Sequence, residues 1–253
     1  EICACLVGSE MCIRDSCTGD TAIALSRIAD NGQFFEVKAD YGKSVAVGFI
    51  RLNGATVGAV ANRSESYDVE GKKVWESDGT LSARGARKAA EFVKFCDAFE
   101  IPVLTLTNVN GFKATVCGEK MMAKSVGALV HAFADATVPK VNVVIGKAFG
   151  TAYTAMNSKA IGADMVYAWE NAEIGMMDAD LAAKIMYAGD DAAALTEKAA
   201  EYRELQNSVS SAAARGYVDT IISPADTRKY VIGAFEMLFT KRENRPDKKH
   251  GTV

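Results

Sequence analysis

Two glycine-containing segments, residues 108–112 (NVNGF) and 146–153 (GKAFGTAY), constrain this chain more than any other feature. Each follows an apolar stretch typical of a buried strand and precedes a helical pattern. A strand that ends at a glycine turn and becomes a helix leaves backbone N–H groups unpaired at the helix start. Two such turns from neighbouring units can converge into an oxyanion hole. The sequence therefore predicts a site that stabilises negative charge with main-chain donors.

Glycine also has a simpler use, because it most often only permits tight backbone geometry. Gly111, Gly146 and Gly150 are open to that interpretation. Small residues at 150–152 (GTA) favour the functional interpretation, because a bulky ligand must approach the backbone there.

The order helix, strand, turn occurs twice in succession around these segments. Ser82 is placed to cap a helix over residues 82–99, and the strand at 103–107 follows Pro102. A second helix over 118–136 is followed by a strand at 141–145. This order predicts right-handed βαβ-like units in an α/β fold, with the functional edge at the ends of the strands.

The rest of the sequence predicts further strands and helices and two polar surface segments. A hairpin is expected over 44–61, because Asn53-Gly54 separates two apolar runs. Residues 62–79 are expected to form a surface excursion and residues 241–250 a basic tail on the surface or against another subunit. The other expected elements are a helix at 20–30, strands at 163–169 and 172–176, and helices at 179–188, on to 214, and at 226–239.

Composition excludes several classes of function. The 253 residues are 49% hydrophobic and 24% charged, which fits one large domain or two small ones. The formal net charge is -3 and the basic residues are scattered, so nucleic-acid binding has no electrostatic support. No apolar run approaches the roughly 20 residues that span a bilayer. We therefore expect a cytoplasmic protein.

Four of the six cysteines lie near the start of the chain, at positions 3, 5, 12 and 17. Their spacing does not match the paired ligands of structural zinc sites, and no metal is expected. Residues 9–16 resemble translated adapter sequence, and position 1 is not a methionine. We therefore expect residues 1–16 to be a non-native leader and residues 17–253 to form the domain.

Familiar catalytic constellations are missing from the sequence. The two histidines, His131 and His250, lie on a polar helix face and in the tail, and no G-x-S-x-G elbow accompanies them. Neither G-x-G-x-x-G at a strand end nor GxxxxGK[ST] occurs. Carboxylates that remain open to acid–base roles or to helix capping are Glu119, Glu173, Asp178 and Asp180.

Several segments resemble the carboxyltransferase subunits of biotin-dependent acyl-CoA carboxylases and decarboxylases, of the propionyl-CoA carboxylase β and methylmalonyl-CoA decarboxylase α type. They are residues 87–103 (RKAAEFVKFCDAFEIPV), 136–141 (ATVPKV), 147–153 (KAFGTAY), 158–159, 162–164, 167–169 and 172–174. The resemblance extends from about residue 20 to the end. It corresponds to the C-terminal half of such a subunit, the carboxybiotin side, and implies a crotonase-like (ClpP/crotonase) ββα superhelix.

The resemblance also implies a chemistry. Carboxyl groups move between carboxybiotin, held on a biotin carboxyl carrier protein, and the α carbon of an acyl-CoA. Backbone amides of this half hold the biotin oxyanion, and a second hole in the N-terminal half of a partner subunit holds the enolate. Implied partners are the carrier protein, acyl-CoA, further copies of the chain in a dimer or larger oligomer and, for a decarboxylase, membrane decarboxylase subunits.

Carried over position by position, the catalytic donors are the N–H groups at Gly111, Phe112, Thr151 and Ala152, and the residues lining the cofactor are Asn110, Gly150 and Tyr153. This sequence departs from the family at three places. Residues 110–115 (NGFKAT) replace the usual Pro-Gly-Phe and following Pro-Gly segment, Thr151 replaces a glycine, and Thr154 replaces a common aspartate. The last position is expected to influence acyl-chain specificity.

The direction of transfer stays open, with a preference for the decarboxylase side because the motifs depart from those of the carboxylases. Two alternatives of other classes also stay open. One is a non-catalytic crotonase-fold scaffold, and the other is a biotin-independent enoyl-CoA hydratase or isomerase. In either transfer direction, we expect this chain alone to be inactive.

Overall fold

The computed structural model describes residues 18–67, 72–189 and 191–243. The expected leader at 1–16 and the cysteines at 3, 5, 12 and 17 lie outside these residues, as does the tail beyond residue 243.

A mixed sheet forms the centre of the molecule, in the order β1-β2-β3-β7-β9-β10-β12, with β11 also paired to β9. The first three strands are antiparallel, whereas β3, β7, β9, β10 and β12 run parallel. Its strands are β1 (Phe34–Val37), β2 (Val45–Leu52), β3 (Ala55–Asn62), β7 (Val103–Val109), β9 (Lys140–Phe149), β10 (Met165–Trp169), β11 (Glu173–Gly175) and β12 (Thr220–Ile222).

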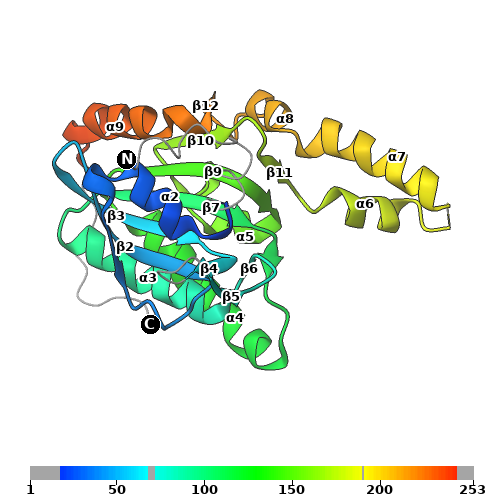
Figure 1. Cartoon of the computed structure of the whole chain (residues 1–253), viewed down its shortest axis with the longest axis horizontal. Helices are drawn as coiled ribbons and strands as arrows, with labels where there is room; N and C mark the ends of the chain where they lie inside the picture. Colours follow the sequence, from blue (N-terminus) through cyan, green and yellow to red (C-terminus); the bar gives the residue numbers. More distant parts are fainter. Residues whose placement is uncertain (1–17, 68–71, 190, 244–253) are drawn as a thin grey trace.

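Helices cover both faces of this sheet, so the described residues form three layers (Figure 1). On one face lie α3 (Ala83–Ala98), α4 (Val116–Asp135) and the short α5 (Gly150–Ala155), packed on the larger apolar core. On the other face lie α2 (Thr21–Ile28) and α9 (Thr227–Met237). Because both faces are covered, the central strands β7 and β9 are buried along most of their length, including their polar residues Thr105, Thr107 and Asn142.

The two predicted βαβ units are confirmed. The crossovers are β3–α3–β7 and β7–α4–β9, and both strand pairs are parallel. Ser82 caps α3 as predicted, since its hydroxyl accepts a hydrogen bond from the Gly85 N–H at 3.1 Å. The predicted hairpin between β2 and β3 is also present, with Asn53 and Gly54 both at positive φ.

The structure differs from the sequence-based predictions in residues 62–79, at the edges of the sheet and at the end of β9. Residues 62–79 are more than an excursion, because β4 (Glu65–Tyr67) pairs with β5 (Lys73–Glu76). The strands β1 and β12 were not anticipated; each has only three or four residues and lies at an edge of the sheet. Strand β9 continues through Gly146 to Phe149, so the second turn begins later than predicted.

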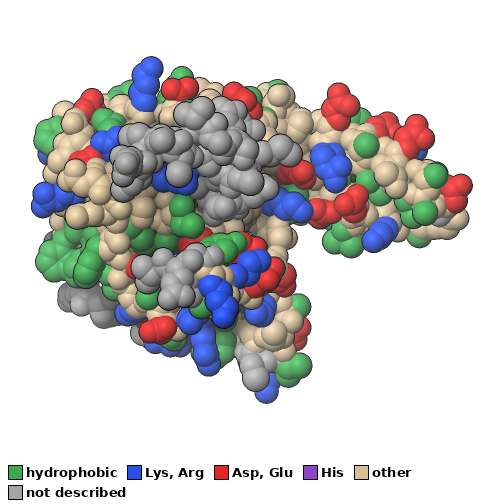
Figure 2. Space-filling model, in the orientation of Figure 1, with side chains coloured by type: hydrophobic (Ala, Val, Ile, Leu, Met, Phe, Trp, Pro, Cys, Tyr) green, Lys and Arg blue, Asp and Glu red, His purple; other side chains and the backbone are tan. Residues whose placement is uncertain are grey.

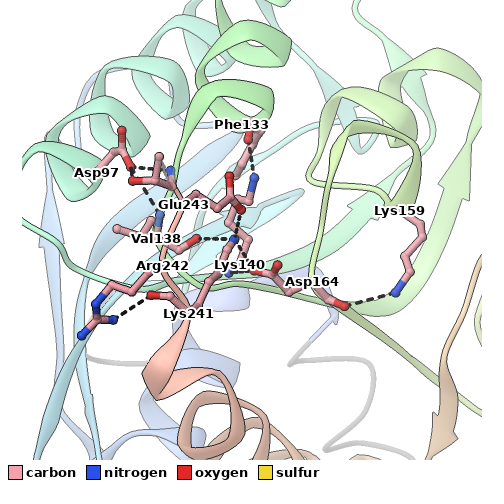
Figure 3. Close-up of polar contacts among 10 residues, drawn as sticks. Asp97, Phe133, Val138, Lys140, Lys159, Asp164, Lys241, Arg242 and Glu243 are labelled. Atoms are coloured by element: carbon pink, nitrogen blue, oxygen red, sulfur yellow. Dashed lines mark hydrogen bonds and ion pairs between the residues drawn. The ribbon is translucent and has the colours of Figure 1, made fainter. Parts of the chain in front are cut away.

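The start of the expected basic tail is not a free surface segment. Lys241 is nearly buried: its Nζ lies 2.9 Å from the Asp164 carboxylate and donates to the Val138 carbonyl at 3.2 Å. Asp164 also accepts from the Lys140 N–H at 2.8 Å, so one carboxylate joins β9 to the end of the described chain (Figure 3).

Two helices leave the compact body as an arm (Figure 1). They are α6 (Ala179–Met186) and α7 (Ala192–Tyr202), which pack against each other. A five-residue π-helix (Arg203–Asn207) and α8 (Val209–Ala214) lead back to the body. The helices predicted at 179–188 and on to 214 are therefore present, but interrupted.

Candidate active site

The two glycine turns lie at the same edge of the sheet. Strands β7 and β9 are parallel neighbours, and Val109 pairs with Ala148 near their carboxyl ends. The chain then enters the short strand β8 (Gly111–Phe112) after β7 and α5 after β9, and these two elements contact each other. The structure thus brings together the two segments that the sequence suggested would converge.

The first turn is held by a small parallel ladder. Strand β8 pairs with β6 (Thr80–Leu81), and the Asn110 N–H donates to the Gly79 carbonyl at 3.0 Å. The Asn110 side chain donates to the Asp78 carbonyl at 2.7 Å. Gly111 has φ +150, which L side chains rarely adopt, and a Cβ there would meet no atom within 4 Å. Backbone conformation, and not crowding, therefore favours glycine at this position.

In the second turn, conformation and crowding both favour glycine. Gly150 has φ +60, and a Cβ on it would lie 3.1 Å from the Met176 carbonyl oxygen. Phe149 supplies no side-chain cap to α5. The first four N–H groups of a helix have no acceptor within it, so the start of α5 presents main-chain donors.

The other predicted residues of this turn differ in exposure. The Thr151 side chain is exposed, whereas Ala152 is buried beneath it. Tyr153 belongs to the apolar core with 8% of its surface exposed, and burial raises the pKa of its phenol to about 12. Thr154 is half-buried, and its hydroxyl lies 3.5 Å from the Gly150 carbonyl. Thr151 and Ala152 can therefore contribute through the backbone, while Tyr153 lies mainly in the core.

A cavity of about 460 Å³ opens at this edge of the sheet. Its polar lining comes from several elements and includes Ser64, Asp78, Asn108, Asn110, Lys147 and Glu173. Two of these residues, Asn108 and Asn110, belong to the first turn, and Lys147 precedes the second. The cavity therefore lies against the ends of β7 and β9, just before the two turns, and its lining does not include Gly111 or residues 150–152.

Asn108 and Lys147 lie in the two segments that the sequence analysis quoted, but the sequence assigned neither of them a role. The Asn108 Oδ1 accepts from the Lys147 N–H at 2.9 Å, so it ties β7 to β9. Lys147 extends toward the arm, and its Nζ lies 3.1 Å from the Asp178 carboxylate. Burial raises the pKa of the Asp178 carboxyl. The hydrogen bond and charge of Lys147, together with backbone hydrogen bonds from Asp180 and Leu181, outweigh burial, so this pKa lies below its usual value. The only feature of the sequence that could have indicated a role for Asn108 is that a polar residue stands at the end of an apolar strand.

Three of the other polar candidates, Asp178, Glu173 and His131, make structural contacts. Asp178 caps α6 by accepting from the Asp180 N–H at 3.0 Å. Glu173 lies 3.4 Å from Arg203, at the base of the arm. His131 is partly exposed and 3.9 Å from Asp135, away from the two turns. Within the described ranges, no group of histidine, cysteine and carboxylate side chains is arranged to hold a metal, and no helix is long and apolar enough to cross a membrane.

Comparison of the sequence with known proteins shows the family of the chain. Residues 14–253 match the carboxyl transferase domain family. The chain belongs to this family. It is 42% identical over 245 residues to the propionyl-CoA carboxylase beta chain of Saccharopolyspora erythraea, covering 92% of this chain and 43% of the relative. It is 39% identical over 236 residues to the methylmalonyl-CoA decarboxylase subunit alpha of Propionigenium modestum, covering 90% of this chain and 44% of the relative.

A solved relative confirms the fold. The crystal structure of transcarboxylase 12S, described as a hexamer with hydrolysed methylmalonyl-coenzyme A bound, matches with a TM-score of 0.82 and 43% identity. The match covers 92% of this chain and 44% of that chain. The predicted crotonase-like α/β fold is therefore correct. The chain spans less than half the length of these carboxyl transferase relatives.

Proposed function

We propose that the complete protein is an acyl-CoA carboxyltransferase, and that the chain described above forms its carboxybiotin side. One observation carries the proposal: two turns with glycine-specific backbone conformations converge at one sheet edge, and the second opens an uncapped helix. Carboxybiotin would supply the carboxyl group, and cleavage of its N–CO2 bond would leave negative charge on the ureido oxygen. Preorganised main-chain donors stabilise such charge without a titrating side chain.

The roles of individual residues follow from this placement. The N–H groups of Gly111 and Phe112 and those of Thr151 and Ala152 would donate to the oxyanion. The positive φ of Gly111 and Gly150 fits this role, because each orients the amides that follow it. Asn110 and Gly150 would line the approach of the cofactor, and Tyr153 would support the turn from the core.

The partners are proposed on the same basis. Biotin would arrive on a biotin carboxyl carrier protein, and the acyl-CoA would bind to the other half of a partner subunit. The arm supports assembly with further copies, because its short helix α6 exposes Leu181, Ile185 and Met186 (Figure 2). Large apolar side chains gathered on one projecting element mark an interaction site.

The acyl-CoA is proposed to be short, since the relatives are named for propionyl-CoA and methylmalonyl-CoA. Thr154 follows the donor turn by two residues and lies on the same helix, which fits the proposed influence on acyl specificity. Comparable identity to a carboxylase and to a decarboxylase gives no preference for either direction. The sequence-based preference for decarboxylation therefore receives no support.

Carboxyl exchange tests the proposal. The complete protein is incubated with methylmalonyl-CoA carrying a labelled carboxyl group and with free biotin, and label in carboxybiotin is measured. The proposal predicts transfer that depends on both substrates. A scaffold would transfer no label, and a hydratase would instead add water to an enoyl-CoA without biotin. Either result would replace the proposed function.

A further inference from the structure

Asn108 lies where the pairing of β7 and β9 loses its register. Thr107 pairs with Val144, and the next pair is Val109 with Ala148. Three residues of β9 (145–147) therefore face the single residue Asn108 of β7. Such an irregularity breaks the backbone ladder and re-aims the chain that follows.

The side chain of Asn108 fills the gap in this ladder. Its Oδ1 accepts from the Lys147 N–H at 2.9 Å, and its Nδ2 donates to the Thr18 carbonyl at 2.9 Å. Its own N–H donates to the Asn62 Oδ1 at 3.3 Å, at the end of β3. One asparagine thus joins β3, β9 and the N-terminal segment to the end of β7.

Gly146 leaves the space that this side chain occupies. A Cβ on Gly146 would lie 2.7 Å from the Asn108 Oδ1 and 3.0 Å from its Cγ. Both distances are shorter than ordinary carbon contacts. Gly146 therefore makes room for the Asn108 side chain. It does not end a strand, although its position in the sequence suggested that it would.

Both donor turns start from the strands that Asn108 joins. Gly111 follows Asn108 by three residues, and Gly150 follows Lys147 by three residues. We propose that Asn108 is a positioning residue, which sets the spacing between the two groups of main-chain donors. The functional part of this inference rests on the proposed carboxyl transfer. Donors must lie within about 2.7–3.1 Å of the oxyanion, and a displacement of about 1 Å can cost roughly 100-fold in rate.

The chemistry of the site requires an amide. Aspartate keeps an oxygen that accepts from the Lys147 N–H, but its second oxygen faces the Thr18 carbonyl, which cannot donate to it. Leucine has nearly the same shape and supplies neither group. Asn108→Asp should therefore retain part of the function, and Asn108→Leu should lose most of it.

Kinetics of the complete protein with its biotinylated carrier test the proposal. In Asn108→Leu, kcat is expected to fall about 10- to 100-fold. The KM for acyl-CoA is expected to stay within about threefold, because that substrate is proposed to bind the other half. Asn108→Asp should fall between parent and Asn108→Leu. The matched control is Gln33→Leu, an exposed amide side chain that lies outside this cavity and outside both turns, which should keep the parental kcat.

Gly146→Ala disrupts the same contact from the β9 side, because its Cβ would lie against the Asn108 side chain. It should lower kcat with the same unchanged KM. The double variant with Asn108→Ala, which removes the side-chain atoms that the new Cβ would meet, should cost no more than Asn108→Ala alone. Additive losses would show that the two residues act separately, because changes at a shared contact are not additive. They would overturn the proposal.

Hydrogen exchange provides a readout independent of activity. Peptides covering residues 109–113 and 147–153 should both exchange faster in Asn108→Leu than in the parent or in Gln33→Leu. Unchanged protection of the second peptide, or a parental kcat in Asn108→Leu, would overturn the positioning role. If the parent itself transfers no carboxyl group, the proposed function is lost, while faster exchange of both peptides still supports the structural link.

Discussion

At the scale of single residues, the proposed oxyanion site depends on donors that belong to the backbone. Thr151 shows this most simply, because its side chain is exposed and its N–H lies in the first turn of α5. Thr151→Gly should leave carboxyl exchange nearly unchanged. Thr151→Pro removes the N–H and should lower kcat roughly 100- to 1,000-fold, about 3 to 4 kcal/mol.

Proline is tolerated best in the first turn of a helix, so the variant is expected to fold. Circular dichroism of the purified Thr151→Pro protein checks this before kinetics are measured. A folded variant that exchanges carboxyl groups at the parental rate would remove this turn from the site.

A second residue-scale prediction concerns Lys88, which is buried beneath β2. Its Nζ donates to the Val45 carbonyl at 2.9 Å and lies 4.0 Å from the Glu36 carboxylate. Burial lowers the pKa of this ammonium from 10.5 to about 8, although Glu36 opposes the shift. At a pH between about 8 and 10.5, Lys88 holds a proton in the unfolded chain that it has released in the folded chain. The free energy of unfolding should therefore rise with pH in that window.

The expected rise is about 3 kcal/mol, since one pKa unit corresponds to about 1.4 kcal/mol. Lys88→Met removes this titration. Urea unfolding at pH 8 and at pH 10.5 should show the parent gaining stability relative to Lys88→Met. A difference between the two proteins that is independent of pH would contradict the prediction.

At the scale of elements, the arm should mediate self-association of this chain. Ile185 is exposed on α6, and Glu is a good helix former, so Ile185→Glu should preserve the helix. Association measured by sedimentation should weaken at least about tenfold, because a charge would enter an apolar contact. Ala123→Glu adds the same charge at an exposed position of α4 and should have no effect. A parental chain that stays monomeric at high concentration would refute this role of the arm.

Most of the larger helices and strands could be predicted from the sequence. The strands β7 and β9 and the helices α3 and α4 were predicted because their apolar periodicity and caps are local signals. The edge strand β1 and the short pair β4 and β5 were missed, since they have few residues and little burial.

The candidate site was only partly predictable. Its glycines were visible because their conformations are local, and Gly111 and Gly150 do have positive φ. The role of Asn108 was not visible, because it depends on a register shift between strands about forty residues apart and on the carbonyl of Thr18. Contacts of that kind arise only when the chain is folded.

At the scale of the whole molecule, this chain supplies one side of the proposed site. It spans less than half the length of its relatives, and the acyl-CoA is proposed to bind the other half. We therefore expect residues 17–253 alone to transfer no carboxyl group between methylmalonyl-CoA and biotin. The complete protein serves as the positive control. A rate for the shorter chain comparable with that of the complete protein would contradict the expectation.

The most direct measurement is a structure of the complete protein with biotin bound. We expect the ureido oxygen to lie about 2.7–3.1 Å from main-chain nitrogens of both turns, one at Gly111 or Phe112 and one at Thr151 or Ala152. If the ureido oxygen instead bound to a side chain, or lay away from either turn, converging backbone amides would not hold the oxyanion.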